Sequence, residues 1–330
     1  MATVIDIHVH IAGTGSESEC YMSDKLRKSP AYILMLAATG QLFNEVNDET
    51  IRRHLMQHLE ESNLVDSAVF LAFDQVHDRK GNPLPEQTNL YTPNDYVADL
   101  AQRHEKVLFG ASVHPDRKDA LEELDRVVER GAVLLKWIPS SQDINPRRKR
   151  YVPFYKKLAD LDLPLLCHVG AEHAIPSPEP ESHYRRFNHP NRLVPALENG
   201  VKVIAAHCCT PVFSWDPNYT GTFINLMQRS YEERWVLYAD VSALTGPFPY
   251  RVGLLKRIVT ELPHERLVLG SDYPIPVSPL WPGAAGEIDF QEWADGLLTG
   301  NPFDRNVKII RALGFAQQVL TNGEKVLLLH

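Results

Sequence analysis

Two histidines one residue apart, His8 and His10, lie in an apolar run close to the start of the chain. Side chains at positions i and i+2 of a strand point to the same side, so these two imidazoles can bind one metal ion. The chain contains 14 histidines, and such a pair also occurs as two ordinary polar residues on a half-buried strand. A metal site therefore needs further ligands from elsewhere in the chain.

Four more polar residues lie at or directly after the ends of predicted strands. Lys136 ends the fourth strand, His168 ends the fifth, His207 follows the sixth, and Asp272 follows the eighth. In a closed barrel of parallel strands these ends form one ring around the mouth, so residues distant in sequence converge there. Each residue alone has an ordinary alternative: a hydrogen-bonded structural histidine, a cap or turn aspartate, or a surface lysine. With the histidine pair, the set predicts a metal site.

Eight short apolar runs position these residues, and each is followed by a segment with helical periodicity. The runs are continuously apolar, as is typical of parallel strands covered by helices. The first run is not followed by the glycine-rich phosphate loop that an open doubly wound sheet would carry. We therefore expect an α/β protein with one (β/α)8 TIM-barrel domain over residues 1–330 and an active site at the C-terminal ends of its strands. The predicted strands are residues 4–10, 67–73, 107–113, 133–137, 163–168, 201–206, 236–241 and 267–270.

The predicted helices alternate with the strands, and several end at a glycine or before a proline. Long loops over residues 11–30, 170–190 and 273–288 follow strand ends on the active-site side of the barrel. The tail is expected to supply the eighth helix and a cap, over residues 304–313 and 316–329. The other predicted helices are residues 94–104, 118–130, 154–161, 193–199, 221–233 and 251–261.

Composition excludes several classes of protein. Hydrophobic residues make up 44% and charged residues 23%, which is typical of a globular protein. The net charge of −8 argues against a nucleic-acid partner, because phosphate binding needs a basic face. No apolar stretch is long enough to span a membrane, and because the first predicted strand begins so close to Met1 we expect no leader. The four cysteines lack the spacing of a metal site or a disulfide scaffold, so we expect reduced thiols in a cytoplasmic protein. The sequence does not decide whether the protein is a monomer or a homo-oligomer.

Several motifs surround the strand-end residues, in residues 6–10, 136–142, 163–170, 205–207, 270–274 and 319–329. In order and spacing they resemble the amidohydrolase superfamily. Within it they resemble the amidohydrolase-related family, which includes aminocarboxymuconate-semialdehyde decarboxylase and the TIM-barrel metal-dependent hydrolases. The resemblance covers essentially the whole chain. It implies a (β/α)8 barrel, one or two divalent metal ions, and catalysis by metal-bound water or hydroxide, but no particular substrate.

Neutral imidazoles and a carboxylate suit Zn²⁺, or another divalent ion such as Mn²⁺, and catalytic zinc sites keep one position open for water. With one ion per chain, the expected ligands are His8, His10, His168 and Asp272. Asp272 would also accept the proton of the attacking water and pass it to the leaving group. His207 would hold the water or the carbonyl, or act as a general acid or base.

A second ion is the alternative. Resemblance to the binuclear members of the superfamily implies that Lys136 would then be carboxylated and would bridge the two ions. His168 and His207 would hold the second ion.

The substrate-binding residues are less clear from the sequence. Arg185 and Arg186, in the loop after the fifth strand, could clamp a carboxylate, or they could be surface charges. Trp137 could line an aromatic pocket or pack in the core.

Three functions fit the predicted site. The leading one is a metal-dependent hydrolase that uses metal-activated water to cleave an amide, lactone or ester bond of a small, carboxylate-bearing molecule. The second is a metal-dependent non-oxidative decarboxylase, a carbon–carbon lyase acting on an aromatic or unsaturated acid with the same ligands. The third is a catalytically inactive barrel that acts as a binding protein, which predicts a degraded ring of residues.

Overall fold

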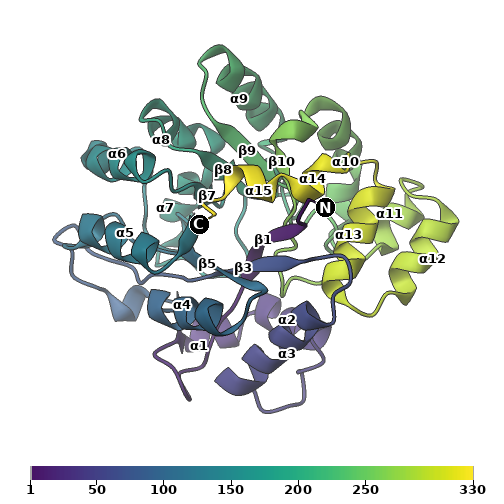
Figure 1. The fold of residues 1–330 in the computed structure, drawn as a ribbon, viewed down its shortest axis with the longest axis horizontal. Coiled ribbons are helices and arrows are strands. Elements are labelled where there is room, and N and C mark those ends of the chain that lie inside the picture. Colours follow the sequence, from purple (N-terminus) through teal and green to yellow (C-terminus); the bar gives the residue numbers. More distant parts are fainter. Residues whose placement is uncertain (1, 330) are drawn as a thin grey trace.

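The computed structural model describes residues 2–329 and shows eight parallel strands arranged as a barrel with helices around it (Figure 1). The strands are β1 (Ile5–His10), β3 (Ser67–Leu71), β5 (Val107–Ala111), β6 (Ala132–Trp137), β7 (Leu165–Cys167), β8 (Val203–Ala205), β9 (Leu237–Asp240) and β10 (Leu267–Val268). They are hydrogen-bonded in that order. The chain after β10 closes the ring on β1, because Ile7 N–H donates to the Leu269 carbonyl (3.0 Å) and Asp272 N–H donates to the His8 carbonyl (2.9 Å). The predicted TIM barrel is confirmed.

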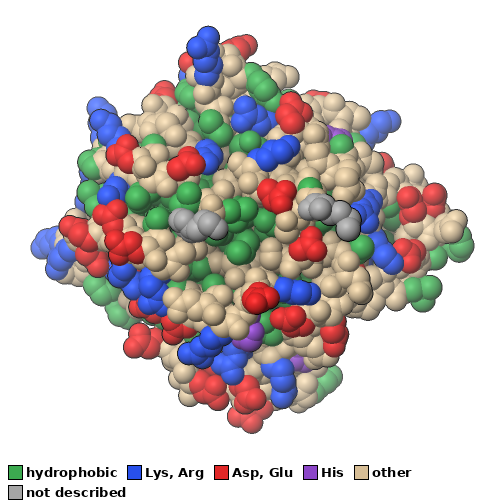
Figure 2. Space-filling model, in the orientation of Figure 1, with side chains coloured by type: hydrophobic (Ala, Val, Ile, Leu, Met, Phe, Trp, Pro, Cys, Tyr) green, Lys and Arg blue, Asp and Glu red, His purple; other side chains and the backbone are tan. Residues whose placement is uncertain are grey.

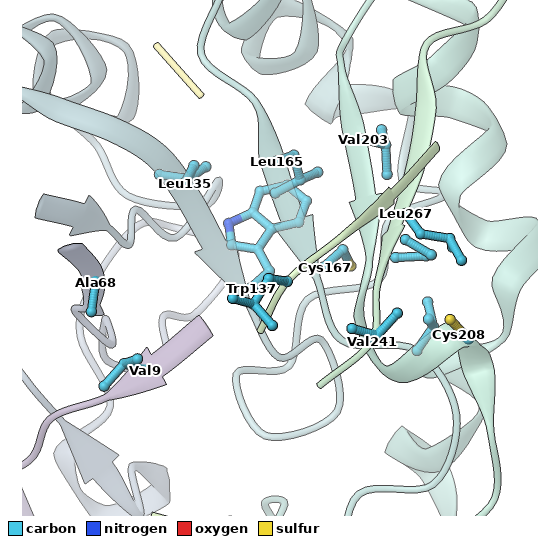
Figure 3. Packing of buried hydrophobic residues seen from close by; sticks show 14 of the residues in the cluster. Val9, Ala68, Leu135, Trp137, Leu165, Cys167, Val203, Cys208, Val241 and Leu267 are labelled. Carbon is cyan, nitrogen blue, oxygen red and sulfur yellow. The ribbon is translucent and has the colours of Figure 1, made fainter. Parts of the chain in front are cut away.

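The eight predicted strands are all present, and most end slightly earlier than expected. Side chains such as Leu135, Trp137 and Leu165 point outward and form the main core with the surrounding helices (Figure 3). A smaller cluster, which includes Leu166 and Ile204, fills the inside of the barrel. Both faces of the strands are therefore buried, which explains why the runs are continuously apolar.

A β-bulge in β1 turns the histidine pair toward the mouth of the barrel. The pairing register between β1 and β3 shifts between Asp6 and Val9. Ile7 belongs to the cluster inside the barrel, whereas Val9 belongs to the outer core. A bulge changes the direction of the side chains that follow it. Ile7 points into the barrel, and because of the shift His8 and His10 point to that same side.

The helices that cover the barrel match the predicted periodic segments. Gly131 and Gly200 follow helix ends with φ of +88° and +83°, a conformation that glycine adopts without strain. The helices are α3 (Asp48–Glu60), α4 (Asn94–Arg103), α5 (Ala120–Glu129), α6 (Val152–Asp160), α8 (Val194–Glu198), α9 (Thr220–Glu232), α10 (Pro249–Glu261) and α13 (Pro302–Ala312).

The C-terminal tail covers the amino-terminal end of the barrel, where it crosses the centre of the view in Figure 1. It forms two short helices, α14 (Gln318–Thr321) and α15 (Gly323–Val326), instead of one continuous segment. Leu327 packs in the cluster inside the barrel, and Leu328 N–H donates to the Val133 carbonyl (3.0 Å). The tail is therefore a cap, as predicted.

The segment between β1 and β3 is more structured than the predicted loop over residues 11–30. It contains β2 (Tyr21–Met22), which pairs with β4 (Leu90–Tyr91), and the helices α1 (Asp24–Arg27) and α2 (Pro30–Ala38). Short helices also lie in the other loops on this side: α7 (Glu181–Tyr184), α11 (Leu280–Ala284) and α12 (Phe290–Leu298). Of these elements, α1 and α2 contribute residues to the cavity at the mouth of the barrel, whereas α11 and α12 pack beside α10 and α13.

On the face shown in Figure 2, acidic and basic side chains are interspersed. Between residues 2 and 329, no helix has both the length and the apolar composition needed to cross a bilayer.

Candidate metal centre

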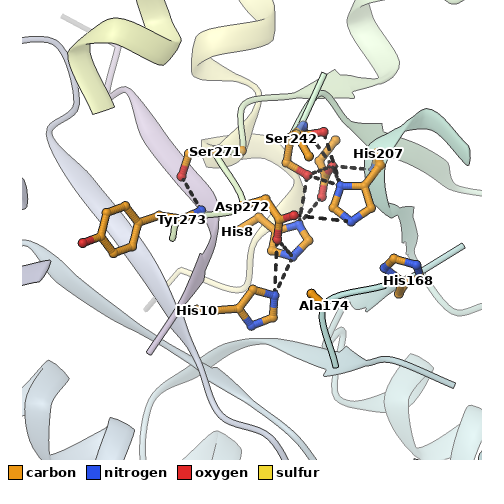
Figure 4. A network of polar contacts seen from close by, with 12 residues as sticks. His8, His10, His168, Ala174, His207, Ser242, Ser271, Asp272 and Tyr273 are labelled. Atoms are coloured by element: carbon orange, nitrogen blue, oxygen red, sulfur yellow. Dashed lines mark hydrogen bonds and ion pairs between the residues drawn. The ribbon is translucent and has the colours of Figure 1, made fainter. Parts of the chain in front are cut away.

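Three potential metal ligands form a triangle at the mouth of the barrel (Figure 4). His8 Nε2 lies 3.2 Å from His10 Nε2 and 3.3 Å from Asp272 Oδ1, and His10 Nε2 lies 3.4 Å from the same oxygen. Ligands at bond lengths of about 2.0–2.1 Å in a tetrahedron are separated by about 3.3 Å. The three donor atoms therefore match one face of a zinc-sized coordination sphere, and three of the four predicted ligands come together.

Asp240, at the end of β9, orients His8. Its Oδ2 accepts a hydrogen bond from His8 Nδ1–H at 2.7 Å, and both side chains are fully buried. Its other oxygen accepts from the backbone N–H of His207 (2.8 Å) and from Ser242 Oγ–H. A carboxylate on one imidazole nitrogen fixes the tautomer and leaves the other nitrogen for a metal. The sequence analysis did not single out Asp240, although a carboxylate at the end of the seventh predicted strand was a usable signal.

Ser242 links His207 to the same carboxylate. Its Oγ lies 2.8 Å from His207 Nδ1 and donates its single proton to Asp240, so it accepts from His207 Nδ1–H. The Nε2 atom of His207 is then an acceptor, and it lies 3.9 Å from Asp272 Oδ2. Asp240 and Ser242 therefore set the tautomers of both His8 and His207.

His207 and Asp272, whose side chains lie 3.9 Å apart, both have unusual backbone conformations. Asp272 has φ of +63°, and His207, Cys208 and Cys209 form a run with φ of +58°, +47° and +57°. Left-handed conformations are costly for residues other than glycine, and they persist where the surrounding structure imposes them, often at functional sites. Here the turn after β8 brings His207 over Asp272.

His168, the fourth predicted ligand, lies next to the triangle but is outside it. Its ring centroid is 5.0 Å from that of His207. Its Nδ1 lies 3.3 Å from Glu172 Oε2, and its Nε2 lies 3.3 Å from the Ala171 carbonyl. The role of His168 as a ligand stays a prediction, and Glu172 is a neighbour that the sequence analysis missed.

Lys136 lies beneath the triangle, as expected from its place at the end of β6. The side chain is fully buried, and Nζ donates to His8 Nε2 at 2.8 Å. Burial lowers the pKa of the amine. A buried amine with a lowered pKa can reach its neutral form, which is the form that reacts with carbon dioxide.

Burial controls the charges of the centre. Burial, with the positive charge of Lys136, lowers the pKa of His8 to about 4, and burial also lowers the pKa of His168 and His207. Burial alone would raise the pKa of Asp272, but the imidazoles of His207 and His8 outweigh it and hold that pKa well below its usual range. At pH 7 the imidazoles of His8, His168 and His207 are neutral and the carboxylate of Asp272 is ionised, which are the forms that bind metal ions.

Comparison with known proteins agrees with this geometry. The family model described as amidohydrolase matches residues 5–303. This chain belongs to the amidohydrolase family. A comparison with curated proteins finds no match.

Solved structures similar to this amidohydrolase share its fold at low identity. A 5-carboxyvanillate decarboxylase from Sphingomonas paucimobilis is 12% identical, with 100% of each chain covered and a TM-score of 0.61. A probable 2-pyrone-4,6-dicarboxylic acid hydrolase from Acinetobacter baumannii, with citric acid bound, is 16% identical, with 98% of each chain covered and a TM-score of 0.57. A manganese complex of 5-carboxyvanillate decarboxylase from Novosphingobium aromaticivorans is 13% identical, covering 98% of this chain and 96% of that one, with a TM-score of 0.55.

A cavity of about 510 Å³ adjoins the donor triangle of this amidohydrolase. Its base includes His10, His168, His207 and Asp272, and most of its wall is apolar. The elements between β1 and β3 cover one side of it. The cavity is large enough for a small organic substrate in contact with the donor triangle.

The three residues proposed for substrate binding, Arg185, Arg186 and Trp137, do not line this cavity. The Arg185 side chain is 73% exposed and lies 3.7 Å from Glu181, and Arg186 is exposed against His183 (3.0 Å); neither lines the cavity. Of the two alternatives for Trp137, an aromatic pocket or the core, the structure shows core packing. Trp137 follows Lys136 in β6, and consecutive side chains of a strand point to opposite sides. Lys136 points into the barrel, and Trp137 points outward and is fully buried in the outer core.

Acidification from pH 7 to pH 5 should destabilise the metal-free protein. Burial lowers the pKa of His8, His114, His168 and His207 below the ordinary value of 6.5, so the unfolded state binds more protons in this range. The free energy of unfolding therefore falls as the pH falls from about 6.5 toward about 4. Asp6 acts in the opposite sense, because burial raises its pKa to about 7. Each net proton is worth about 1.4 kcal/mol per pH unit.

Urea unfolding at pH 7, 6 and 5 measures this effect. Asp6 Oδ1 accepts from the backbone N–H of His8 (3.1 Å) and Ser271 (3.0 Å), and asparagine can keep both bonds. The variant Asp6→Asn removes the opposing group, so its stability should depend more steeply on pH. Stability that is constant or rises on acidification would contradict the neutral buried histidines.

Proposed function

We propose that this amidohydrolase is a divalent-metal-dependent hydrolase that cleaves an amide, lactone or ester bond of a small, carboxylate-bearing molecule. The observation that carries the proposal is the donor triangle of His8, His10 and Asp272, which lies at the base of the cavity with Asp272 Oδ2 and His207 Nε2 3.9 Å apart beside it. Hydrolysis needs an electrophilic ion together with a proton carrier next to it.

The donor set suits Zn²⁺ or Mn²⁺, held by His8, His10 and Asp272, with His168 as the proposed fourth ligand. A bound divalent ion would polarise the carbonyl of the substrate and lower the pKa of a coordinated water toward about 7. The remaining steps fall to side chains of the chain itself.

Two side chains are placed to move the proton. Asp272 uses Oδ1 in the triangle, and its Oδ2 is available to take a proton from the attacking water and deliver it to the leaving group. His207 presents the unprotonated Nε2 that Ser242 and Asp240 enforce, so it can accept a hydrogen bond from that water. The 3.9 Å between the two acceptor atoms leaves room for a shared proton donor.

A non-oxidative decarboxylase is the second candidate. The observation in its favour is the likeness of the fold to 5-carboxyvanillate decarboxylase, at a TM-score of 0.61. The same centre would have to hold a carboxylate beside an electron sink and then protonate carbon. An inactive barrel finds less support, because every predicted strand-end position holds a chemically competent residue.

A panel of substrates separates these candidates. Purified protein loaded with zinc or with manganese is incubated with lactones, N-acyl compounds and aromatic acids, while acid release and carbon dioxide are both recorded. We expect hydrolysis of at least one lactone, ester or amide without carbon dioxide release. Carbon dioxide release without hydrolysis would replace the proposal by the decarboxylase. Turnover on no substrate, with ligand binding unchanged in His8→Ala, would favour the binding protein.

The metal content tests whether the centre holds one ion or two. We expect one equivalent per chain, because His8, His10 and Asp272 form a single donor triangle at the base of the cavity. The variant Lys136→Met, which keeps the buried volume, should then retain one equivalent after desalting. Two equivalents in the wild type that fall in the variant would show that a carboxylated Lys136 bridges two ions.

A further inference from the structure

Arg251 is a buried cation in the wall of the cavity. It lies in the first turn of α10, and only 3% of it is exposed. Its Nε donates to the Pro211 carbonyl (3.1 Å) and its Nη1 donates to the Ala243 carbonyl (2.7 Å). These bonds hold the guanidinium plane in one orientation, beside the ring of Phe248 at 5.0 Å.

Within residues 2–329 the guanidinium makes no ion pair, although buried charges are usually paired; the carboxylates of Asp272, Asp216 and Glu172 act on it only from a longer distance. Its remaining nitrogen, Nη2, makes no hydrogen bond within that range and is not enclosed by protein atoms. Burial lowers the pKa of Arg251 to about 10, so the group is still a cation at neutral pH. An oriented cation with a free donor in a cavity wall is suited to bind an anion.

Away from the donor triangle at its base, the cavity offers little to a second anionic group. Arg251 is the only lysine or arginine among the residues that line it. One of the two acidic side chains there, Glu172, is already engaged: Oε1 accepts from the N–H groups of Ala174 (2.6 Å) and Ile175 (2.8 Å). Apolar side chains make up most of the wall, among them Leu26, Met35, Leu55, Ile138 and Phe248.

We propose that Arg251 binds the carboxylate of the substrate, and that the substrate is a monoanion with an otherwise apolar body. This inference rests on the proposed hydrolase and narrows its substrate class. It assigns the carboxylate contact to α10, away from the exposed Arg185 and Arg186. It also predicts that a second carboxylate lowers affinity, because that group would lose its hydration against an apolar wall.

Calorimetry on the full-length, metal-loaded protein tests the proposal with three probes that share one body: phenylacetate, its uncharged amide phenylacetamide, and the dicarboxylate homophthalate. The wild type should bind phenylacetate at least about 10-fold more tightly than phenylacetamide, since hydrogen bonds between charged groups are the stronger kind. It should bind homophthalate no more tightly than phenylacetate. In Arg251→Gln the preference for phenylacetate over its amide should disappear, and in Arg251→Lys it should persist in part.

The ratio of the two affinities separates recognition from structure. A purely structural role for Arg251 would lower both affinities by the same factor, and a carboxylate bound elsewhere would leave the ratio unchanged in Arg251→Gln; either result overturns the proposal. If that variant does not fold, diffraction from wild-type crystals soaked in phenylacetate decides. A carboxylate oxygen within about 3.2 Å of Arg251 Nη2 supports the proposal, and any other position contradicts it. Binding needs no turnover, so failure of the hydrolase assignment would be seen separately in the substrate panel.

Discussion

Replacing Asp272 by asparagine should lower kcat by about 1000-fold while the barrel stays folded. The amide keeps an oxygen at the position of Oδ1, which lies 3.3 Å from His8 Nε2 and 3.4 Å from His10 Nε2. It carries no charge to balance the ion, and its second atom is an NH₂ group that cannot accept a proton. Both the affinity for metal and the proton transfer are therefore impaired. Steady-state kinetics at saturating metal concentration isolates the proton transfer.

Asp304 provides the matched control. It is also buried, and its carboxylate accepts from Ser62 Oγ–H (2.6 Å) and from the Leu64 N–H (3.0 Å), away from the cavity. The variant Asp304→Asn should lower the free energy of unfolding and leave kcat within about twofold. A kcat for Asp272→Asn within tenfold of the wild type would remove Asp272 from the proton transfer.

Replacing His10 by alanine should weaken metal binding by more than 100-fold. Loss of residues that only orient a ligand costs about 10–100-fold in metal affinity, and loss of a ligand should cost more. His10 is partly exposed, and its nearest polar contacts are the two other members of the triangle, so the fold should tolerate the change. Competition with a chelating dye measures the dissociation constant.

Two further variants serve as references for the size of the loss in metal affinity. Asp240→Asn, which removes the carboxylate that orients His8 but no atom of the donor triangle, should fall within the 10–100-fold range. His189→Ala, whose imidazole accepts from the Asn191 N–H (3.2 Å) outside the centre, should leave the affinity unchanged. Equal affinities in the wild type and His10→Ala would show that the ion, if bound, lies elsewhere.

Much of the barrel was predictable because burial on both faces leaves strands with an unbroken apolar composition. Polar residues stand out where such runs end, and for this reason the sequence alone places His8, His10, His207 and Asp272 together. The helices around the barrel followed from their periodicity and from stop residues such as Gly131. Each of these signals is local in sequence, and closure of the barrel brings the strand-end residues close together in space.

Other features depend on contacts that the sequence does not display. Asp240 lies at a strand end, as the other site residues do, but its role comes from the imidazole of His8, 232 positions away. Helix α2 is apolar on all sides because it lies over a cavity, so it has no helical periodicity to detect. Arg251 looks like a surface residue at the start of a helix, and only the three-dimensional structure shows it buried beside a cavity. The sequence left Trp137 between a pocket and the core, and the structure decides for the core, because one step along a strand from Lys136 reverses the direction of the side chain.

The most direct test of the metal centre is anomalous diffraction from crystals of the zinc-loaded protein. We expect one strong anomalous peak at the zinc edge, about 2.0–2.2 Å from His8 Nε2, His10 Nε2 and a carboxylate oxygen of Asp272. The electron-density map from the same crystals would show whether the His168 ring turns to complete the site. The absence of a peak at this triangle, or a peak bound only by other residues, would contradict the assignment of His8, His10 and Asp272 as the ligands.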